Sequence, residues 1–332
     1  MSPVSRRTFL LGATTAAVGA VAASRFLRDE PTPWNTSAFQ PPGEARVALV
    51  RATSYDGDLE GLVFDGLGAI GVDVRGATVL LKPNLVEHQE GVPINTDPRL
   101  VAAAALALRR LGARSVTVAD GPGHRRDTRY VLVRSGLDDA LRAVGVPFVD
   151  LNTDALVRRR LETRYTSLGT LWLPRSVTDA DVVVSMPKLK THHWAGATLS
   201  LKNCFGCVPG RVYGWPKNAL HFHGIERSIL DVAAAVRPRY SIVDGIVGME
   251  GNGPINGTPI DAGVLLFGDD PVATDVIAAT AMGLDPERIP YLVEAGRFLG
   301  QGHRDSIRTE GEDVAGAVRS FSLLPEFEDL RA

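Results

Sequence analysis

Short apolar segments rich in β-branched residues alternate along this chain with longer segments of helical periodicity, and this alternation constrains the fold more than any other feature. The apolar segments lie at 47–50, 78–81, 115–119, 181–185, 240–243 and 264–267. Short strands that alternate with helices are typical of a mostly parallel sheet covered by helices. The predicted fold class is therefore α/β, with an open, mostly parallel sheet flanked by helices. The sequence also leaves room for a smaller α+β insertion that forms a cleft.

Four helices can be bounded from the sequence. The clearest has Asp97 as its N-cap and Pro98 at its first helical position, and it stops at Gly112. The other three are predicted at 137–144, 225–236 and 271–282, and each ends close to a glycine or a proline. The segment 153–174 is harder to interpret, and a hairpin is the expectation there.

The first 23 residues are predicted to be a twin-arginine signal peptide. Arg6 and Arg7 precede an apolar run that is too short to span a bilayer comfortably, and Ala20 and Ala22 form an A-x-A cleavage site. The expected partner is the twin-arginine translocase, and the expected location is periplasmic or extracellular. This export route resembles that of proteins that fold, and often bind a cofactor, before they cross the membrane.

Residues 24–45 contain four prolines and no periodicity, which predicts an extended tether, and the α/β domain is expected over 46–332. About 285 residues are enough for one large domain or two smaller ones that share a cleft. The formal net charge is −2 and there is no long basic run, so nucleic acid is not an expected partner. No later apolar stretch is long enough to span a membrane.

Polar residues follow most of the predicted strands. Because the carboxyl ends of parallel strands meet at one edge of a sheet, these residues are expected to line a common cleft. The expected lining residues are Lys82, Asn84, Asp120, Lys188, Asp244 and Asp270. The alternative is that they are ordinary turn residues. That alternative is strongest for Asp270, which precedes Pro271 as an N-cap would, and weakest for the lysines, because lysine does not favour turns.

The segment 181–223 holds most of the unusual chemistry. The chain has only five lysines among its 36 basic residues, and four of them lie here, with four of the seven histidines and both cysteines. A chain that uses arginine almost everywhere for surface charge is expected to keep lysine where a compact, titratable ammonium is needed. The alternative is a chance cluster on a solvated face.

A metal site is one hypothesis for the histidines. In an extended segment, His221 and His223 would lie on the same side and, with Glu250 or Asp244, would suit zinc, iron or manganese. The alternative is that these histidines bind or protonate a substrate. His192 and His193 are adjacent, so at most one is expected to face the cleft.

The two cysteines, Cys204 and Cys207, cannot hold an iron–sulfur cluster by themselves, because such a cluster needs four ligands. They are expected to form a disulfide outside the cytoplasm or to be two buried thiols. Glycine-rich pieces at 196–197, 205–210 and 248–254 lie among the lysines, and together they suit a small anionic ligand, a phosphate or a carboxylate.

Several segments, taken together, resemble the domain of unknown function 362 family: LKPNLV (81–86), MPKLKTH (186–192), SLKNCFGCVPG (200–210), HFH (221–223), VDGIVGMEGNGP (243–254) and GDDPVATD (268–275). The resemblance extends from about Val47 to Gly302. It implies no particular reaction, and the ferredoxin-type cysteine clusters of some relatives do not carry over to a chain with two cysteines. The family pattern maps onto Lys82, Asn84, Lys188, Lys190, His192, Lys202, Asn203, Gly206, Asp244, Glu250, Asp270 and Asp275.

The prediction from the sequence is an exported enzyme that acts on a small anionic substrate, by hydrolysis or redox chemistry, with or without a metal or cofactor. The expected catalytic residues are Lys82, Lys188, His192, Lys202 and Asp244. The expected cofactor-binding residues are Asn84, Asp120, Lys190, Asn203, Gly206, Gly251, Asp270 and Asp275, and the expected metal ligands are His221, His223 and Glu250. The alternatives are a protein that binds a cofactor or anion without turnover and a component of a cell-envelope complex.

Overall fold

The computed structural model describes residues 36–123 and 127–332, so the predicted signal peptide lies outside the described residues. The described end of the expected tether packs against the domain. The Phe39 ring meets the Phe298 ring edge-on at 5.1 Å, and the Gln301 amide donates to the carbonyl oxygens of Pro42 and Gly43. Residues 36–45 are therefore held against the domain.

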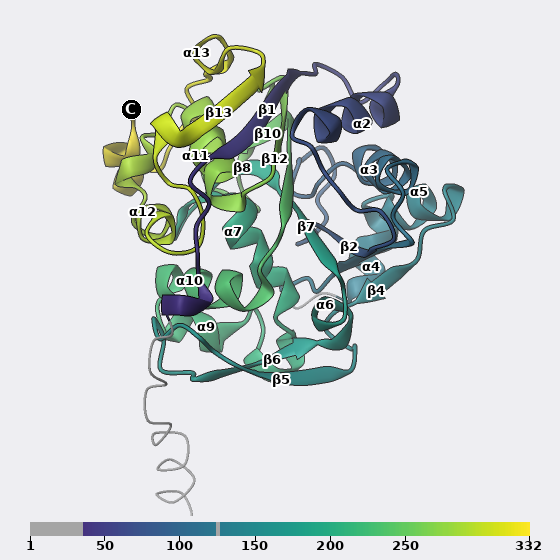
Figure 1. Ribbon diagram of the computed structural model, residues 1–332, viewed down its shortest axis with the longest axis vertical. Coiled ribbons are helices and arrows are strands. Elements are labelled where there is room, and N and C mark those ends of the chain that lie inside the picture. Colours follow the sequence, from purple (N-terminus) through teal and green to yellow (C-terminus); the bar gives the residue numbers. More distant parts are fainter. Residues whose placement is uncertain (1–35, 124–126) are drawn as a thin grey trace, which may run out of the picture.

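One large sheet forms the centre of the domain, and its main path has eight strands (Figure 1). In spatial order these are β13 (Ile307–Gly311), β1 (Ala45–Arg51), β12 (Val264–Gly268), β10 (Tyr240–Glu250), β7 (Val182–Met186), β2 (Thr78–Pro83), β3 (Ser115–Asp120) and β4 (Phe148–Asp150). Neighbouring strands are parallel except where β12 pairs with β1 and with β10. The mostly parallel sheet predicted from the sequence is confirmed.

Helices cover both faces of the sheet (Figure 1). On one side lie α2 (Leu59–Ala69), α3 (Pro98–Arg110) and α5 (Leu137–Ala143), and on the other lie α10 (Ile225–Val236), α11 (Pro271–Ala281) and α12 (Pro290–Gly296). Successive strand residues point to opposite faces, so Leu80 packs in one core and Leu81 in the other. Two hydrophobic cores therefore sandwich the sheet and hold its carboxyl edge in place.

The four helices bounded from the sequence are confirmed to within two residues at each end. The Asp97 side chain accepts from the Arg99 N–H and caps α3 as predicted. The expected hairpin is also confirmed, because β5 (Leu156–Arg160) and β6 (Thr170–Pro174) form a separate antiparallel pair. This pair and the short helix α6 (Arg175–Thr178) make up a small insertion between β4 and β7.

Two strands differ from the prediction in a way that matters for the site. β10 continues to Glu250, well beyond the expected end at 243, and a new strand β8 (Lys188–His192) pairs in parallel with it. The residues after Pro187 alternate between polar and apolar, which suits a strand. A further short strand, β9 (Gly196–Thr198), pairs with β8 and extends the sheet. Lys188 and Asp244 are therefore strand residues, and neither lies in a loop beyond a strand end.

The prediction for Asp270 is wrong, because β12 runs antiparallel to its neighbours. Gly268 pairs with Ser241 near the start of β10, so the end of β12 lies at the opposite edge of the sheet from the cleft. The Asp270 carboxylate instead accepts from the N–H groups of Val272 and Ala273 and caps α11. This is the capping alternative considered for Asp270 on sequence grounds.

The remaining described elements are mostly short. They are α4 (Thr128–Arg134), α7 (Ser200–Asn203), η2 (Cys204–Cys207), α8 (Gly210–Tyr213), α9 (Asn218–Phe222), β11 (Thr258–Ile260), α13 (Val314–Ala317) and the 3-10 turns η1 (Thr36–Ala38), η3 (Pro286–Arg288), η4 (Arg304–Ser306) and η5 (Pro325–Leu330). Within the part of the chain that is described, no helix has the length and apolar character needed to cross a membrane.

Candidate functional site

A cavity of about 290 Å³ lies beyond the carboxyl ends of β2 and β3, closed by residues from β8 and from the segment that follows it. Nine of the residues predicted for the site line it: Lys82, Asn84, Asp120, Lys190, His192, Lys202, Asn203, Gly206 and His221. Lys82, Asn84 and Asp120 come from the argument about strand ends, whereas Lys188, Asp244 and Asp270, expected for the same reason, do not line the cavity. The hairpin insertion contributes no lining residue, so the main sheet and the segment after β7 form this cavity.

Lys82 and Asp120 form a buried ion pair at the base of the cavity. The Lys82 Nζ lies 3.0 Å from Asp120 Oδ1, and both side chains are 1% exposed. The Asp120 carboxylate also accepts from the N–H groups of Leu85 and Gly121, both at 2.7 Å. These contacts fix the carboxylate at the ends of two adjacent strands, which in turn fixes the ammonium of Lys82.

Asn203 joins this pair to the rest of the cavity wall. Its Oδ1 accepts from Lys82 Nζ at 3.2 Å and from Asn84 Nδ2 at 3.1 Å. The Asn84 Oδ1 and the Thr198 hydroxyl are buried and have no hydrogen-bond partner among the described residues. Because buried polar atoms are nearly always paired, these two atoms are available to a bound molecule.

Position 206 requires a glycine, because a side chain there would overlap the ion pair. A Cβ at this position would lie 2.1 Å from Asp120 Oδ1 and 2.4 Å from Lys82 Nζ. The turn that contains Gly206 can therefore approach the ion pair only because it has no side chain there.

Three further lysines face the cavity without a carboxylate of their own. Lys217 donates to the carbonyl oxygens of Gly121 and Phe205, and burial lowers its pKa to about 8. Lys190 donates to the Ile94 carbonyl at 2.6 Å, and burial, with the neighbouring ammonium of Lys188, holds its pKa well below the ordinary value. Neither lysine forms an ion pair of its own, and the charge of Asp120, which acts on both, offsets the effect of burial only in part.

Lys202 differs from the other lysines of the cavity. Its Nζ lies 4.1 Å from the centre of the Phe205 ring, and no described residue accepts a hydrogen bond from it. Burial, together with the charges of Lys217 and Lys82, lowers its pKa to about 7. An amine with this pKa is present in both protonation states near neutral pH, as a general base requires.

Two histidines of the cavity, His192 and His221, are neutral at neutral pH. His192 Nδ1 accepts from the Trp194 N–H, so its proton is on Nε2, and burial keeps its pKa well below the ordinary value. Burial lowers the pKa of His221 to about 4, and its ring packs edge-on against Trp194 at 4.9 Å. His193 Nδ1 lies 2.7 Å from the Gly253 carbonyl oxygen and donates to it. His192 and His221 can therefore donate or accept hydrogen bonds but add no charge at neutral pH.

The overall electrostatic character of the cavity is cationic. Its lining residues include four lysines, and Asp120 is the one carboxylate among them. Positive charge in a buried, weakly polarisable environment attracts anions more strongly than it would at the surface. The arrangement is suited to an anion small enough to fit about 290 Å³.

Lys188 and Asp244, which were predicted to line the cleft, are not among its lining residues. Lys188 Nζ lies 2.6 Å from Asp244 Oδ2 and 2.9 Å from the Tyr55 hydroxyl, and all three groups are buried. Asp244 also accepts from the Tyr55 hydroxyl and from the Asp97 N–H. This closed network ties β8 and β10 to the start of α3 and has a structural role.

Asp275, Gly251 and Glu250 also lie outside the cavity. The buried Asp275 carboxylate accepts from the N–H groups of Ser200 and Leu201 at the start of α7, and burial raises its pKa to about 7. It therefore positions the helix that carries Lys202 and Asn203. Gly251 has a φ of 74° where the chain turns after β10, and Glu250 accepts from the Ser322 N–H.

The predicted metal ligands are not brought together. His221 lies within the helical segment α9 and His223 is its C-cap, so the two side chains are not on one side as they would be in an extended segment. The His223 ring instead contacts the Ser167 hydroxyl at 3.2 Å. No group of three histidine, cysteine or acidic residues within 36–123 and 127–332 is placed to hold a metal ion.

Cys204 and Cys207 are buried free thiols in the 3-10 turn after α7. Burial raises the pKa of both, to about 12 for Cys207, so neither is a reactive thiolate. Neither cysteine is a lining residue of the cavity. Of the two expectations for this pair, the structure has the buried thiols.

Lys217, His193, Trp194 and Thr198 line the cavity but were not predicted as site residues. The expectation that at most one of His192 and His193 faces the cleft is wrong, because both line it. Lys217 lies in the lysine-rich segment 181–223, and that position is the sequence feature from which it could have been predicted. Its backbone has a φ of 68°, in the left-handed region, and this conformation directs its chain toward the carbonyl oxygens of Gly121 and Phe205. Nothing in the local sequence indicates that conformation.

Comparisons with known proteins place the chain in a family. The sequence profile of a family described as a domain of unknown function (DUF362) matches residues 79–280. A thylakoid-associated protein of Synechocystis sp. is 34% identical over 263 residues, which is 76% of this chain and 79% of that protein. The lactate racemase apoprotein from Thermoanaerobacterium thermosaccharolyticum aligns in structure with 69% of this chain, at 16% identity and a TM-score of 0.42, and the aligned part is 55% of that protein.

Proposed function

The chain belongs to the DUF362 family, and on that premise we propose that its lysine-lined cavity is the active site of an enzyme for a small anionic substrate. Lys202 is proposed to exchange a proton with the bound substrate. Lys82, Lys190 and Lys217 are proposed to bind its anionic group, and His192 and His221 to donate hydrogen bonds to it.

The observation that supports this proposal is the excess of buried positive charge. Four lysines and one carboxylate face a cavity whose volume is about 290 Å³. Burying uncompensated ammonium groups is unfavourable, and folded proteins accept that cost mainly where a ligand supplies the missing charge. A carboxylate or phosphate would supply it, and either can accept hydrogen bonds from several donors at once.

The case for catalysis, as distinct from binding, depends on Lys202. A binding site needs charged lysines only, whereas the depressed pKa of Lys202 also provides a neutral amine near pH 7. The ring of Phe205 is its one close partner among the described residues, so its lone pair is not occupied by a neighbour. A proton abstracted from the substrate would be taken up by this amine.

The alternative function is a protein that binds the same anion without turnover. Both functions need the lysines, so loss of affinity in a lysine variant does not separate them. Proton exchange on the ligand does, because a pure binding protein has no reason to catalyse it.

The test starts with anion binding and continues with exchange. Calorimetry and thermal shift with phosphate and a panel of small mono- and dicarboxylates should detect binding that Lys202→Met weakens by about tenfold, the effect of removing one charged hydrogen bond. Ligands that bind are then incubated with the enzyme in D₂O, and loss of their C–H signals is followed by NMR. Lys202→Arg should keep affinity but lose exchange, because arginine is not deprotonated in proteins.

Three outcomes are decisive. Binding with exchange that disappears in Lys202→Arg supports the enzyme. Binding without exchange for every bound anion overturns the catalytic proposal and leaves the binding protein. Absence of binding for the whole panel, in protein that melts cooperatively, overturns both.

We further propose that the protein works outside the cytoplasmic membrane after export by the twin-arginine translocase. The support is the paired Arg6 and Arg7 before an apolar run, together with the name of the Synechocystis relative, a thylakoid-associated protein. Replacing both arginines by lysine should leave the protein in the cytoplasmic fraction. Unchanged export of that variant would contradict the proposal.

A further inference from the structure

We propose that the β5–β6 hairpin is a docking face for an anionic membrane surface, separate from the lysine-lined cavity. The face consists of the outward side of the hairpin, with Arg158, Arg160 and Trp172, and the groove behind it, with Arg159 and Arg237. It lies at the end of the molecule where the described chain begins (Figure 1).

The outward side of the hairpin combines arginine with an exposed aromatic ring. Arg158 pairs directly with Trp172, and Arg160 pairs with Thr170, so their side chains share one side of the ribbon. The other side carries Leu171 and Leu173, which are at most 1% exposed, and Arg159, which is exposed and lines the groove. Trp172 is 42% exposed, and neither Arg158 nor Arg160 forms an ion pair with a described residue. Packing against the core therefore explains the leucines on one side of the hairpin, but it does not explain the exposed arginines and tryptophan on the other.

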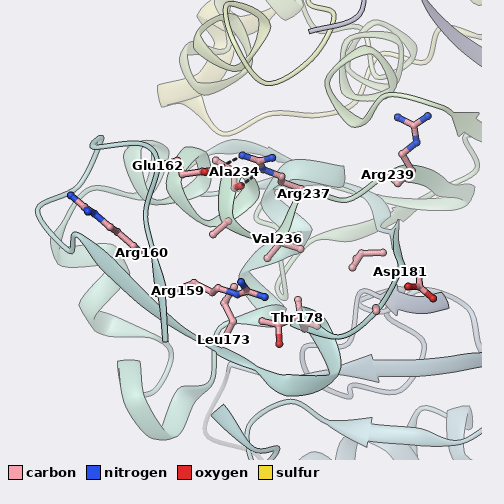
Figure 2. Close-up of a pocket in the computed structure, with 14 residues that line it drawn as sticks. Arg159, Arg160, Glu162, Leu173, Thr178, Asp181, Ala234, Val236, Arg237 and Arg239 are labelled. Atoms are coloured by element: carbon pink, nitrogen blue, oxygen red, sulfur yellow. Dashed lines mark hydrogen bonds and ion pairs between the residues drawn. The ribbon is translucent and has the colours of Figure 1, made fainter. Parts of the chain in front are cut away.

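The groove behind the hairpin adds positive charge (Figure 2). It has a volume of about 390 Å³ and is lined by four arginines and two acidic residues. Glu162 is paired with Arg237, and Asp181 is held by Thr78 and Arg114 outside the groove. Figure 2 shows Arg159 beside Leu173 and Thr178 within the groove and Arg160 pointing away from it. Arg159, Arg160 and Arg239 have no carboxylate partner among the described residues.

The start of the domain lies beside this face. The Arg237 guanidinium is 4.7 Å from the centre of the Phe39 ring, so the chain enters the domain next to the groove. Twelve residues, 24–35, separate the apolar run from the first described residue, and they can extend over about 40 Å at most. In protein that keeps its signal, an apolar run inserted in a bilayer would therefore keep the hairpin end close to the lipid surface.

A second exposed ring lies at the same end. Phe222, at the end of α9, is 86% exposed, and the next residue, His223, contacts Ser167 in the loop between β5 and β6. Exposed Trp and Phe insert at the headgroup level, and arginine binds lipid phosphates. These groups are spread over an outward surface and do not enclose a single anion, so a bilayer fits them better than one small phosphate does.

Vesicle binding of the full-length protein tests the proposal. Phosphatidylcholine vesicles with and without phosphatidylglycerol are compared by co-sedimentation. Binding should be stronger to the anionic vesicles and should fall as salt rises. Arg158→Glu with Arg160→Glu should lower the partition coefficient on anionic vesicles by at least about tenfold, and Trp172→Ser should lower it by several-fold. Arg134→Glu with Arg308→Glu makes the same charge change on α4 and β13, away from the hairpin, and is expected to alter it by less than about twofold.

Each contrary result has a distinct meaning. Equal binding to both vesicle types, unchanged in the hairpin variants, would mean that the N-terminal apolar run alone binds lipid and would overturn the docking face. Equal losses in the hairpin and control variants would also overturn it, because net charge alone would then explain binding. If inorganic phosphate displaces the protein at an ionic strength where sodium chloride does not, the arginines form a site for free phosphate and the membrane proposal fails.

Discussion

Two buried lysine regions of this protein, only a few residues apart in sequence, are built on opposite principles. Lys188 has a carboxylate at 2.6 Å, and a tyrosine hydroxyl and a backbone carbonyl complete its contacts. Lys202, in the cavity, has an aromatic ring and no hydrogen-bond acceptor among the described residues. The first region is neutral and closed, whereas the second has one carboxylate, Asp120, for four lysines and borders a cavity.

This difference teaches how a structural lysine can be told from a functional one. Lys188 is buried and Lys202 is half-buried, but Lys190 and Lys217 of the cavity are as buried as Lys188, so burial alone does not separate the two kinds. What separates them is whether the fold itself supplies the counter-charge. Where the protein supplies it, removing the lysine leaves a buried carboxylate unpaired, and where it does not, removing the lysine relieves a cost of folding.

The largest expected effect comes from breaking the closed region. Lys188→Met should lower the free energy of unfolding by about 3–5 kcal/mol, because Asp244 would remain buried without its ammonium partner. Urea unfolding measures the change, and Lys202→Met is the matched substitution in the open region. Equal destabilisation in the two variants would contradict the distinction between the regions.

The next effect concerns the approach of backbone to the Lys82–Asp120 pair. Gly206→Ala should destabilise the protein by about 1–3 kcal/mol and weaken anion binding, because the added methyl overlaps the ion pair. Gly68→Ala is the control, since nothing lies within 4 Å of a Cβ at this exposed helical position. The control should be stabilised by about 0.5–1 kcal/mol. Anion binding by Gly206→Ala at wild-type affinity would show that the pair is not part of the site.

A third experiment uses pH to sharpen the description of the open region. The folded-state pKa of Lys202, about 7, lies below its usual value of 10.5, so between these values the unfolded chain binds more protons than the folded one. The Lys202 contribution to the free energy of unfolding should therefore rise with pH across this window. Lys202→Met should be more stable than the wild type near pH 7, by about 1–3 kcal/mol, and this advantage should shrink toward pH 10.

That comparison is made by urea titration of both proteins at several pH values. An advantage of Lys202→Met that is constant with pH would mean that the amine does not change charge on folding in this range. The proposed role of Lys202 as a base would then lose its physical support.

The smallest expected effect separates two neighbouring histidines. His221 lines the cavity, whereas His223 does not and instead contacts Ser167. His221→Ala should weaken anion binding several-fold through one lost hydrogen bond of about 1 kcal/mol, whereas His223→Ala should leave it unchanged. Isothermal calorimetry with the tightest anion of the panel decides this. A loss in His223→Ala equal to that in His221→Ala would favour a joint role such as metal binding.

Much of the candidate site follows from local patterns. The strand before Lys82 and the strand before Asp120 are apolar runs, and parallel pairing brings their ends together wherever the fold is α/β. The chain has few lysines, and most of them lie in the segment that closes the cavity, so their clustering identified that segment. These features are set by neighbouring residues and by general sheet geometry, so they could be predicted.

Other features depend on pairing between distant segments. Asp270 follows an apolar run like those before Lys82 and Asp120, but its strand is antiparallel, and nothing within that run sets its direction. Lys188 and Lys190 belong to the same short strand, yet only the partner that each meets across the sheet decides which is neutralised. The Asp244 carboxylate reaches Lys188 because β10 continues past its apolar start, as its pairing with β8 allows.

The sequence by itself determined the layered α/β architecture, the capped helix at Asp97 and the set of lysines from which a site would be built, because hydrophobic periodicity and capping act over a few residues. Tertiary structure alone decided which lysines carry uncompensated charge, since a buried ammonium is neutralised or not by a carboxylate that lies dozens of residues away. The same holds for His221 and His223, whose separation depends on a short helical turn held by packing. Interactions between neighbouring residues therefore determined which residues could form the site, and contacts between distant segments determined which of its lysines are neutralised.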